Sequence, residues 1–190
     1  MSLFNLFKKQ PSATKPEIPA DTLFFHEDDF CQVELVPGEN LPFLKNEIQN
    51  VSDFAAEHST EHGYTSTYLR NDPSVELVDK QIPTFQFEET VKISGLERAG
   101  AVSTGYGSNY REECKNIVGY GKGYSAIYYT HNNGIVKNIW ITNHFTLDKD
   151  RLTDFLIQCG QKWNLLLVDW NEPVVIDICN KGEIEKYLNG

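Results

Sequence analysis

Residues 125 to 141 have the sequence Ser125-Ala-Ile-Tyr-Tyr-Thr-His-Asn-Asn-Gly-Ile-Val-Lys-Asn-Ile-Trp-Ile141, and this stretch decides the fold. Two β-prone runs, 125–129 and 135–141, flank the dipeptide Asn133-Gly134. This dipeptide favours a two-residue hairpin turn because both of its positions tolerate positive φ. The stretch therefore predicts an antiparallel β-hairpin.

The chain after this hairpin predicts a helix and then a second hairpin. Thr146 can cap the helix. Five apolar residues recur at helical spacing and so lie on one face of this helix: Leu152, Phe155, Leu156, Cys159 and Trp163. Residues 164–170 form a continuous apolar strand, residues 174–178 pair with it, and residues 182–188 close the chain as a short helix.

The chain before the hairpin predicts two strands and a long helix. Residues 22–25 and 31–36 are short β-prone runs, so a hairpin is expected with the polar residues 26–29 at its tip. Asn40 can then cap a helix that Gly63 ends. The apolar face expected for this helix consists of Leu44, Ile48, Val51, Ala55 and His58.

The middle of the chain is less regular. Strands are expected at 64–69, 85–87 and 91–93, and seven of the 13 glycines fall between residues 95 and 123. Residues 119–125, which overlap that segment, are expected to form a mobile or bulged connection, because they lack the order of a phosphate-binding loop. The fold class predicted is α+β, a mainly antiparallel sheet with two principal helices packed on it and a short C-terminal helix.

Length and composition indicate one domain. The chain has 190 residues, 40% of them hydrophobic, which is enough for an independent core and excludes wholesale disorder. Residues 1–20 are expected to be a short amphipathic segment and a Pro-rich linker, and residues 21–190 a single α+β domain. No apolar run approaches the ~20 residues of a membrane span, so a cytoplasmic protein is expected.

Cysteine and histidine spacing gives little sign of metal or redox chemistry. The cysteines, at positions 31, 114, 159 and 179, form no Cys-x-x-Cys pair and are expected to be free thiols. His58-Ser-Thr-Glu-His62 matches the inverted zinc-peptidase pattern. Because Gly63 places this motif on the last turn of its helix, the preferred interpretation of both histidines is structural, and no catalytic residue and no cofactor are predicted. The alternative is a small metal-dependent hydrolase that uses His58 and His62.

The negative charge is concentrated in one part of the chain. The net charge is −10, and residues 21–63 contain ten acidic residues and one lysine, a net −9. Such a segment is either a solvated surface or a docking face for a basic protein partner. Six residues are expected to contact this partner: Glu27, Asp28, Asp29, Asp53, Glu57 and Glu61. The charge disfavours nucleic acid as a ligand.

Two further kinds of contact involve the N-terminus. Four apolar residues precede the linker and need a surface on which to dock: Leu3, Phe4, Leu6 and Phe7. A scaffold or dimerisation protein, and hence a homo-oligomer, is therefore an alternative. Membrane contact is disfavoured because the two lysines that follow contribute only about 1 kcal/mol each toward anionic lipid.

The C-terminal run from Asn164 to Leu188, which contains Leu-Leu-Leu-Val-Asp-Trp-Asn-Glu-Pro-Val-Val-Ile-Asp-Ile, resembles the closing hairpin and helix of small cytosolic bacterial proteins. Several of those are immunity proteins of polymorphic toxin systems. The opening Met-Ser-Leu-Phe-Asn-Leu-Phe-Lys-Lys is also similar to starts common among them. The resemblance implies a non-enzymatic bacterial protein that neutralises a toxin by binding it, and it assigns no role to any single residue.

Overall fold

The computed structural model describes residues 21–61, 63–105 and 111–190, so the predictions for residues 1–20 lie outside the described residues. The elements, with η for a 3₁₀-helix, follow in the order β1 (Thr22–His26), η1 (Glu27–Asp29), β2 (Val33–Pro37), η2 (Gly38–Asn40), α1 (Leu41–His58), β3 (Ser59–Thr60), β4 (Gly63–Tyr64), η3 (Leu77–Lys80), α2 (Thr84–Val91), η4 (Lys92–Ser94), β5 (Ala101–Gly105), β6 (Glu112–Glu113), β7 (Ile117–Lys122), β8 (Ser125–Asn132), β9 (Ile135–Thr142), η5 (His144–Thr146), α3 (Lys149–Trp163), β10 (Leu165–Asp169), β11 (Val174–Ile176) and α4 (Lys181–Asn189). The predicted α+β class is confirmed. Within these ranges, no helix has both the length and the apolar character needed to cross a membrane.

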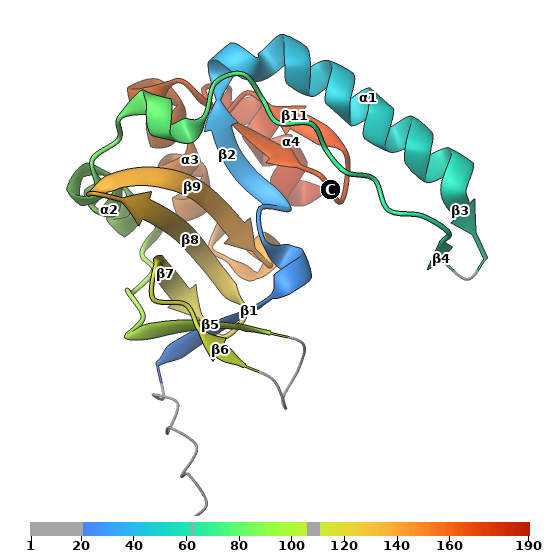
Figure 1. Ribbon diagram of the computed structural model, residues 1–190. Helices are drawn as coiled ribbons and strands as arrows, with labels where there is room; N and C mark the ends of the chain where they lie inside the picture. Colours follow the sequence, from blue (N-terminus) through green and yellow to red (C-terminus); the bar gives the residue numbers. More distant parts are fainter. Residues whose placement is uncertain (1–20, 62, 106–110) are drawn as a thin grey trace, which may run out of the picture.

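The predicted hairpin lies in a six-stranded antiparallel sheet with the order β11-β10-β2-β9-β8-β7 (Figure 1). β8 and β9 form this hairpin, and Asn133 and Gly134 turn it with φ of 49° and 78°. β2 pairs with β10 along its length, but its described register with β9 consists of the single pair Glu34 and Trp140. β2 and β9 therefore diverge beyond this pair.

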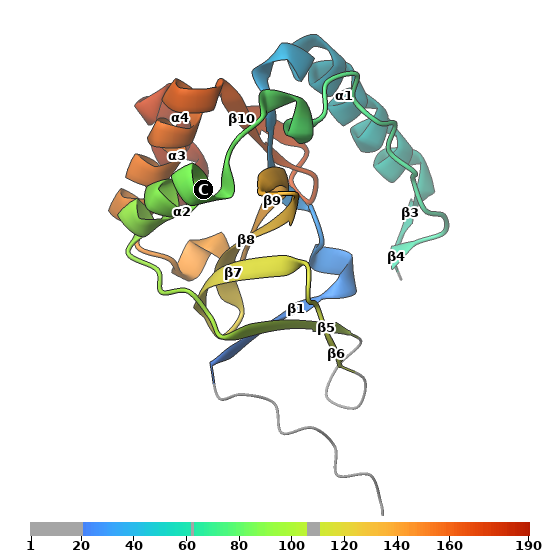
Figure 2. The ribbon, with the colours of Figure 1, turned by 60° about the vertical axis from the view of Figure 1, so that its left-hand side comes forward.

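Three helices cover one face of this sheet. Figure 2 shows α2, α3 and α4 together on that side, with α1 on the other. Phe87 of α2 and Phe155 of α3 share a buried core with Leu165 and Leu167 of β10. The predicted α3 and the β10–β11 hairpin are confirmed, although Asp148 rather than Thr146 caps α3, by accepting a hydrogen bond from the Arg151 N–H at 3.1 Å.

The opposite face of the sheet has two separate covers. Leu44 of α1 packs there against Leu166 and Val168, which alternate with the residues that face α3. A three-stranded sheet, β1-β5-β6, covers the other end and packs Phe25 against Trp140. The middle of this face lies between the two covers, and the groove described below opens there.

The hairpin expected between residues 22–25 and 31–36 is wrong. β1 pairs in parallel with β5, with Thr22 opposite Ala101, and only β2 enters the large sheet. The residues between them form η1, not a hairpin tip, and Cys31 has a left-handed φ of 52° that redirects the chain. Burial of Leu23 and Phe25 over β8 and β9 stabilises this arrangement.

The strands expected at 85–87 and 91–93 are also wrong, because this segment is α2 followed by η4. Phe87, Thr90 and Val91 are buried at helical spacing. The strand expected at 64–69 is reduced to Tyr64, which pairs with Ser59. Residues 119–125 do not form a separate bulged connection, because residues 117–122 pair regularly with β8.

The long helix differs in detail from its prediction. α1 ends at His58, before Gly63, and its buried residues are Leu44 and Glu47. Asn40 does not cap it, because its side chain hydrogen-bonds the backbone N–H and C=O of Val75 at 3.2 and 2.8 Å. This contact holds the chain that returns from the outer end of α1.

Candidate functional site

A groove of about 630 Å³ lies on the face of the large sheet that α1 and the three-stranded sheet cover, at the point where β2 and β9 diverge. β2 contributes Glu34, β9 contributes Lys137, and Trp170 follows β10. One wall is the return segment, which we define as residues 65–76. Phe30, next to η1, bounds the groove as well.

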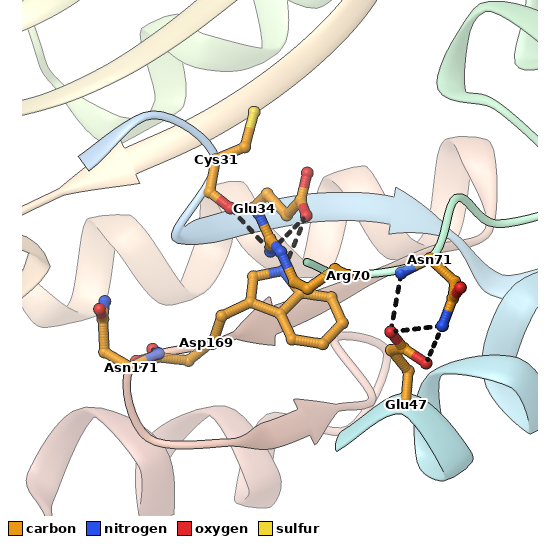
Figure 3. A network of polar contacts seen from close by, with 8 residues as sticks. Cys31, Glu34, Glu47, Arg70, Asn71, Asp169 and Asn171 are labelled. Carbon is orange, nitrogen blue, oxygen red and sulfur yellow. Dashed lines mark hydrogen bonds and ion pairs between the residues drawn. The ribbon is translucent and has the colours of Figure 1, made fainter. Parts of the chain in front are cut away.

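A polar network around Glu34 joins the return segment to the sheet (Figure 3). Trp170 Nε1 donates a hydrogen bond to Glu34 Oε1 at 2.8 Å, and Arg70 Nη1 lies 3.5 Å from the same oxygen. The Arg70 guanidinium also stacks 4.5 Å from the centre of the Trp170 ring and donates to the Cys31 carbonyl at 3.3 Å. Burial raises the pKa of Glu34, while the Trp170 hydrogen bond and the Arg70 charge oppose that rise.

Cys31 is a buried thiol beside this carboxylate. Burial raises the pKa of Cys31 well above its usual range, and the negative charge of Glu34 raises it further. A thiol needs its thiolate form to act as a nucleophile or a metal ligand. The groove therefore does not present an activated cysteine. All four cysteines, each in the described part of the chain, are free thiols.

Glu47 of α1 holds the return segment from the other side. It is 1% exposed, and it accepts hydrogen bonds from the Asn71 N–H at 2.8 Å, from Asn71 Nδ2 and the Tyr68 hydroxyl at 3.1 Å, and from Asn50 Nδ2 at 3.2 Å. Burial alone would raise the pKa of Glu47, but these hydrogen bonds outweigh it and lower the pKa. The return segment has little regular structure, and Arg70 and Asn71 attach it to the sheet and to α1 respectively.

One apolar residue points away from these attachments. Leu69 is 85% exposed, although both of its neighbours, Tyr68 and Arg70, are fixed by polar contacts. We call the second half of α1 with β3, β4 and the return segment the arm, and Figure 1 shows it projecting from the body of the molecule. The arm therefore presents Leu69 from a fixed backbone at the rim of the groove.

The six acidic residues predicted to bind a partner are all exposed, and the structure divides them into two groups. Glu27, Asp28 and Asp29 form η1, which adjoins the groove through Phe30 and Cys31. In the other group, Asp53 and Glu57 belong to the arm, and Glu61 lies in the turn that follows β3.

The other four acids of the same stretch have partners inside the fold, and one of them is Asp21, which accepts a hydrogen bond from the Gly100 N–H at 2.9 Å. Glu34 and Glu47 are held as described, and Glu39 forms an ion pair with Lys80 at 2.7 Å. The acidic surface is therefore smaller than the count over residues 21–63 suggests.

His58 has local contacts within the helix. Its Nδ1 lies 2.9 Å from the Phe54 carbonyl oxygen, and its ring stacks on Phe54 at 3.9 Å. His62, the second histidine of the zinc-type pattern, lies outside the described residues. Among those that are described, no group of three or more histidine, cysteine, aspartate or glutamate residues could hold a metal ion.

Comparison with models of protein families, with curated proteins and with solved structures gives no significant match. Arg70 and Trp170 are residues of this site that the sequence does not predict, because neither belongs to a local motif. Alternation along residues 31–36 does indicate that Glu34 faces away from Val33 and Leu35, but it carries no sign of a partner 36 residues further on.

Proposed function

We propose that this chain is a non-enzymatic binding protein that takes a basic protein partner across the groove and the arm. We further propose that it is a bacterial immunity protein, which acts in the cytoplasm and neutralises a basic toxin domain by occluding it. The observation that carries the proposal is the exposure of all six predicted acidic residues, one group on η1 beside the groove and the other on the outer part of α1 and the turn after β3. Complementary charge of this kind raises association rates and selects the partner.

The apolar side chain of Leu69 supports a protein partner rather than a small cation. If a partner buries this exposed leucine, the burial contributes about 1.5 to 3 kcal/mol to the free energy of binding. Holding its neighbours through Glu34 and Glu47 lowers the entropy lost on binding. The rim of the groove thus presents a rigid apolar contact, with the acidic residues of η1 beside it.

The chemistry of the groove favours binding over catalysis. Glu34 is already engaged by Trp170 and Arg70, and burial keeps Cys31 protonated. A general base or a nucleophile has to be available to substrate. Neither group meets this requirement in the present arrangement.

The test is kinetic. After covalent cross-linking and identification of the partner from the host, association rates are measured for the wild type and for two charge reversals, E27K/D28K/D29K and D53K/E57K/E61K. We expect slower association for both, and a wild-type rate that falls as salt rises, because exposed charges are screened. The matched control is D150K/D154K/E185K, on the exposed surface of α3 and α4. Equal rates for all variants would reject the proposal.

A further inference from the structure

A second hollow, of about 310 Å³, shares Gln32 with the groove. Its walls come from η1, from the turn between β7 and β8, from the chain between β9 and α3, and from the turn between β10 and β11. Two aromatic side chains, Tyr124 and Phe145, line it and remain 62% and 55% exposed. We call it the aromatic hollow.

Both aromatic residues have fixed surroundings. The Tyr124 ring packs edge-on against Phe24 at 5.9 Å, and the Tyr124 carbonyl accepts a hydrogen bond from the Thr142 hydroxyl at 2.6 Å. Phe145 lies against the His144 ring, with 3.9 Å between ring centres. Two large aromatic side chains left exposed at one hollow indicate a contact surface.

The charge of the aromatic hollow is uncompensated. Its carboxylates are Asp29, Asp169 and Glu172, and neither lysine nor arginine is among the described residues that line it. Burial lowers the pKa of His144, although Asp169 opposes this, so the imidazole is neutral near pH 7. The hollow therefore favours a cation.

A polar group without a partner lies at this hollow. His144 is 4% exposed, and its Nε2 has no hydrogen-bond partner among the described residues. Asp169, in contrast, is fully engaged, because Oδ1 accepts from the N–H groups of Asn171 and Glu172 and Oδ2 accepts from the Tyr187 hydroxyl at 2.7 Å. Buried polar groups normally have partners, so Nε2 is an unsatisfied polar atom in the wall of the hollow, and it is itself closed off from solvent.

The groove provides an internal example of the interaction that the aromatic hollow lacks. There, the Arg70 guanidinium stacks on Trp170 and lies 3.5 Å from the Glu34 carboxylate. Arginine suits such a place because its planar, weakly hydrated group stacks on a ring and pairs with a carboxylate at once. Tyr124, Phe145 and Glu172 offer the same two kinds of contact.

We propose that the aromatic hollow binds the guanidinium group of an arginine side chain that the protein partner presents. This inference rests on the proposed function for the partner, but it concerns a different part of the surface. It makes the hollow a second contact point beside the groove, one that selects arginine.

The experiment titrates the full chain, labelled with ¹⁵N, with the peptide acetyl-Gly-Gly-Arg-Gly-Gly-amide. The reference peptide has citrulline in place of arginine, which keeps the shape and removes the charge. We expect saturable chemical-shift changes centred on residues 124, 143–145 and 172, and at least tenfold weaker binding of the citrulline peptide. Equal binding of both peptides, or shifts centred elsewhere, would overturn the inference.

Variants test the contacts directly. Tyr124→Ala, Phe145→Ala and Glu172→Gln should each weaken arginine-peptide binding about three- to tenfold, as expected for one cation–π or ionic contact. Phe85→Ala and Asp154→Asn, at exposed positions on α2 and α3, should leave it unchanged. Undiminished binding in the hollow variants would reject the site.

The two proposals can fail separately. Arginine-peptide binding at the hollow together with partner association that no charge reversal slows would reject the proposed function alone. Slowed partner association without peptide binding at the hollow would reject the inference alone.

Discussion

The groove and the aromatic hollow use the same chemical groups in opposite ways. In the groove, Glu34 and Trp170 already contact Arg70, a cation of the same chain. In the aromatic hollow, carboxylates and exposed aromatic rings surround space that no lysine or arginine of the described residues lines. Because Arg70 pairs with Glu34 and Trp170, the groove network is a structural contact that fixes the arm. The carboxylates and rings of the aromatic hollow have no such pairing within the described part of the chain and can bind a cation from a partner. The comparison predicts that substitutions in the network of Glu34, Arg70 and Trp170 change stability, and that substitutions in the hollow change binding.

The largest effect is expected for Arg70→Met. This variant leaves the Glu34 carboxylate without its cation, and breaking a buried pair costs about 3 to 5 kcal/mol. Because the Arg70 side chain is 30% exposed, we expect a smaller loss, about 2 to 3 kcal/mol in the free energy of unfolding by urea denaturation.

The control for this prediction is the double variant. Glu34→Gln keeps an acceptor for Trp170, so it should cost less than about 1 kcal/mol. In the Glu34→Gln background, Arg70→Met should then lower the free energy of unfolding much less than it does in the wild type. Equal losses in the two backgrounds would mean that Arg70 does not stabilise the fold through Glu34.

A smaller effect, about 1 to 2 kcal/mol at pH 7, is expected for Glu47→Gln, because an amide cannot replace every hydrogen bond that the carboxylate accepts. The folded-state pKa of Glu47 is lowered, so its contribution is present above the ordinary glutamate pKa and is lost as the pH falls through the folded value. The stability difference from wild type should therefore shrink as the pH falls below about 4.

Glu34 should behave in the opposite way, since its pKa is raised. A raised carboxyl pKa means that the folded state binds its proton more tightly than the unfolded state does. The contribution of Glu34 to the free energy of unfolding therefore becomes more favourable as the pH falls. Urea denaturation of wild type, Glu34→Gln and Glu47→Gln at several pH values checks both signs. The same direction for both variants would contradict the assignment of their environments.

The smallest effects on stability are expected in the aromatic hollow. Phe145→Ala and Glu172→Gln should each change the free energy of unfolding by less than about 1 kcal/mol, because both side chains are exposed. Thermal melts measure this directly. Losses as large as that of Arg70→Met would mean that the hollow is part of the packed core.

The parts of the fold that the sequence predicts correctly have their signals within a short stretch. Asn133-Gly134 specifies the β8–β9 hairpin, and one apolar face specifies α3. β1 was misplaced because its true neighbour begins 79 residues later, at Ala101. The network of the groove was missed for the same reason, since Glu34 and Arg70 become neighbours only when the arm returns to the sheet.

The position of β2 has a consequence for how the chain folds. The other five strands of the large sheet lie between residues 117 and 176, and β9 leads through α3 to β10, so β2 enters a gap in a unit that is otherwise continuous in sequence. Pairing Pro37 with Leu165 closes a loop of about 130 residues, and such distant pairing is slow. At about 5 to 20 residues per second on the ribosome, β2 waits roughly 6 to 26 s for β10 to be made. We therefore expect this central strand to be synthesised before all of its neighbours in the sheet and to complete its pairing only after β10 has been made.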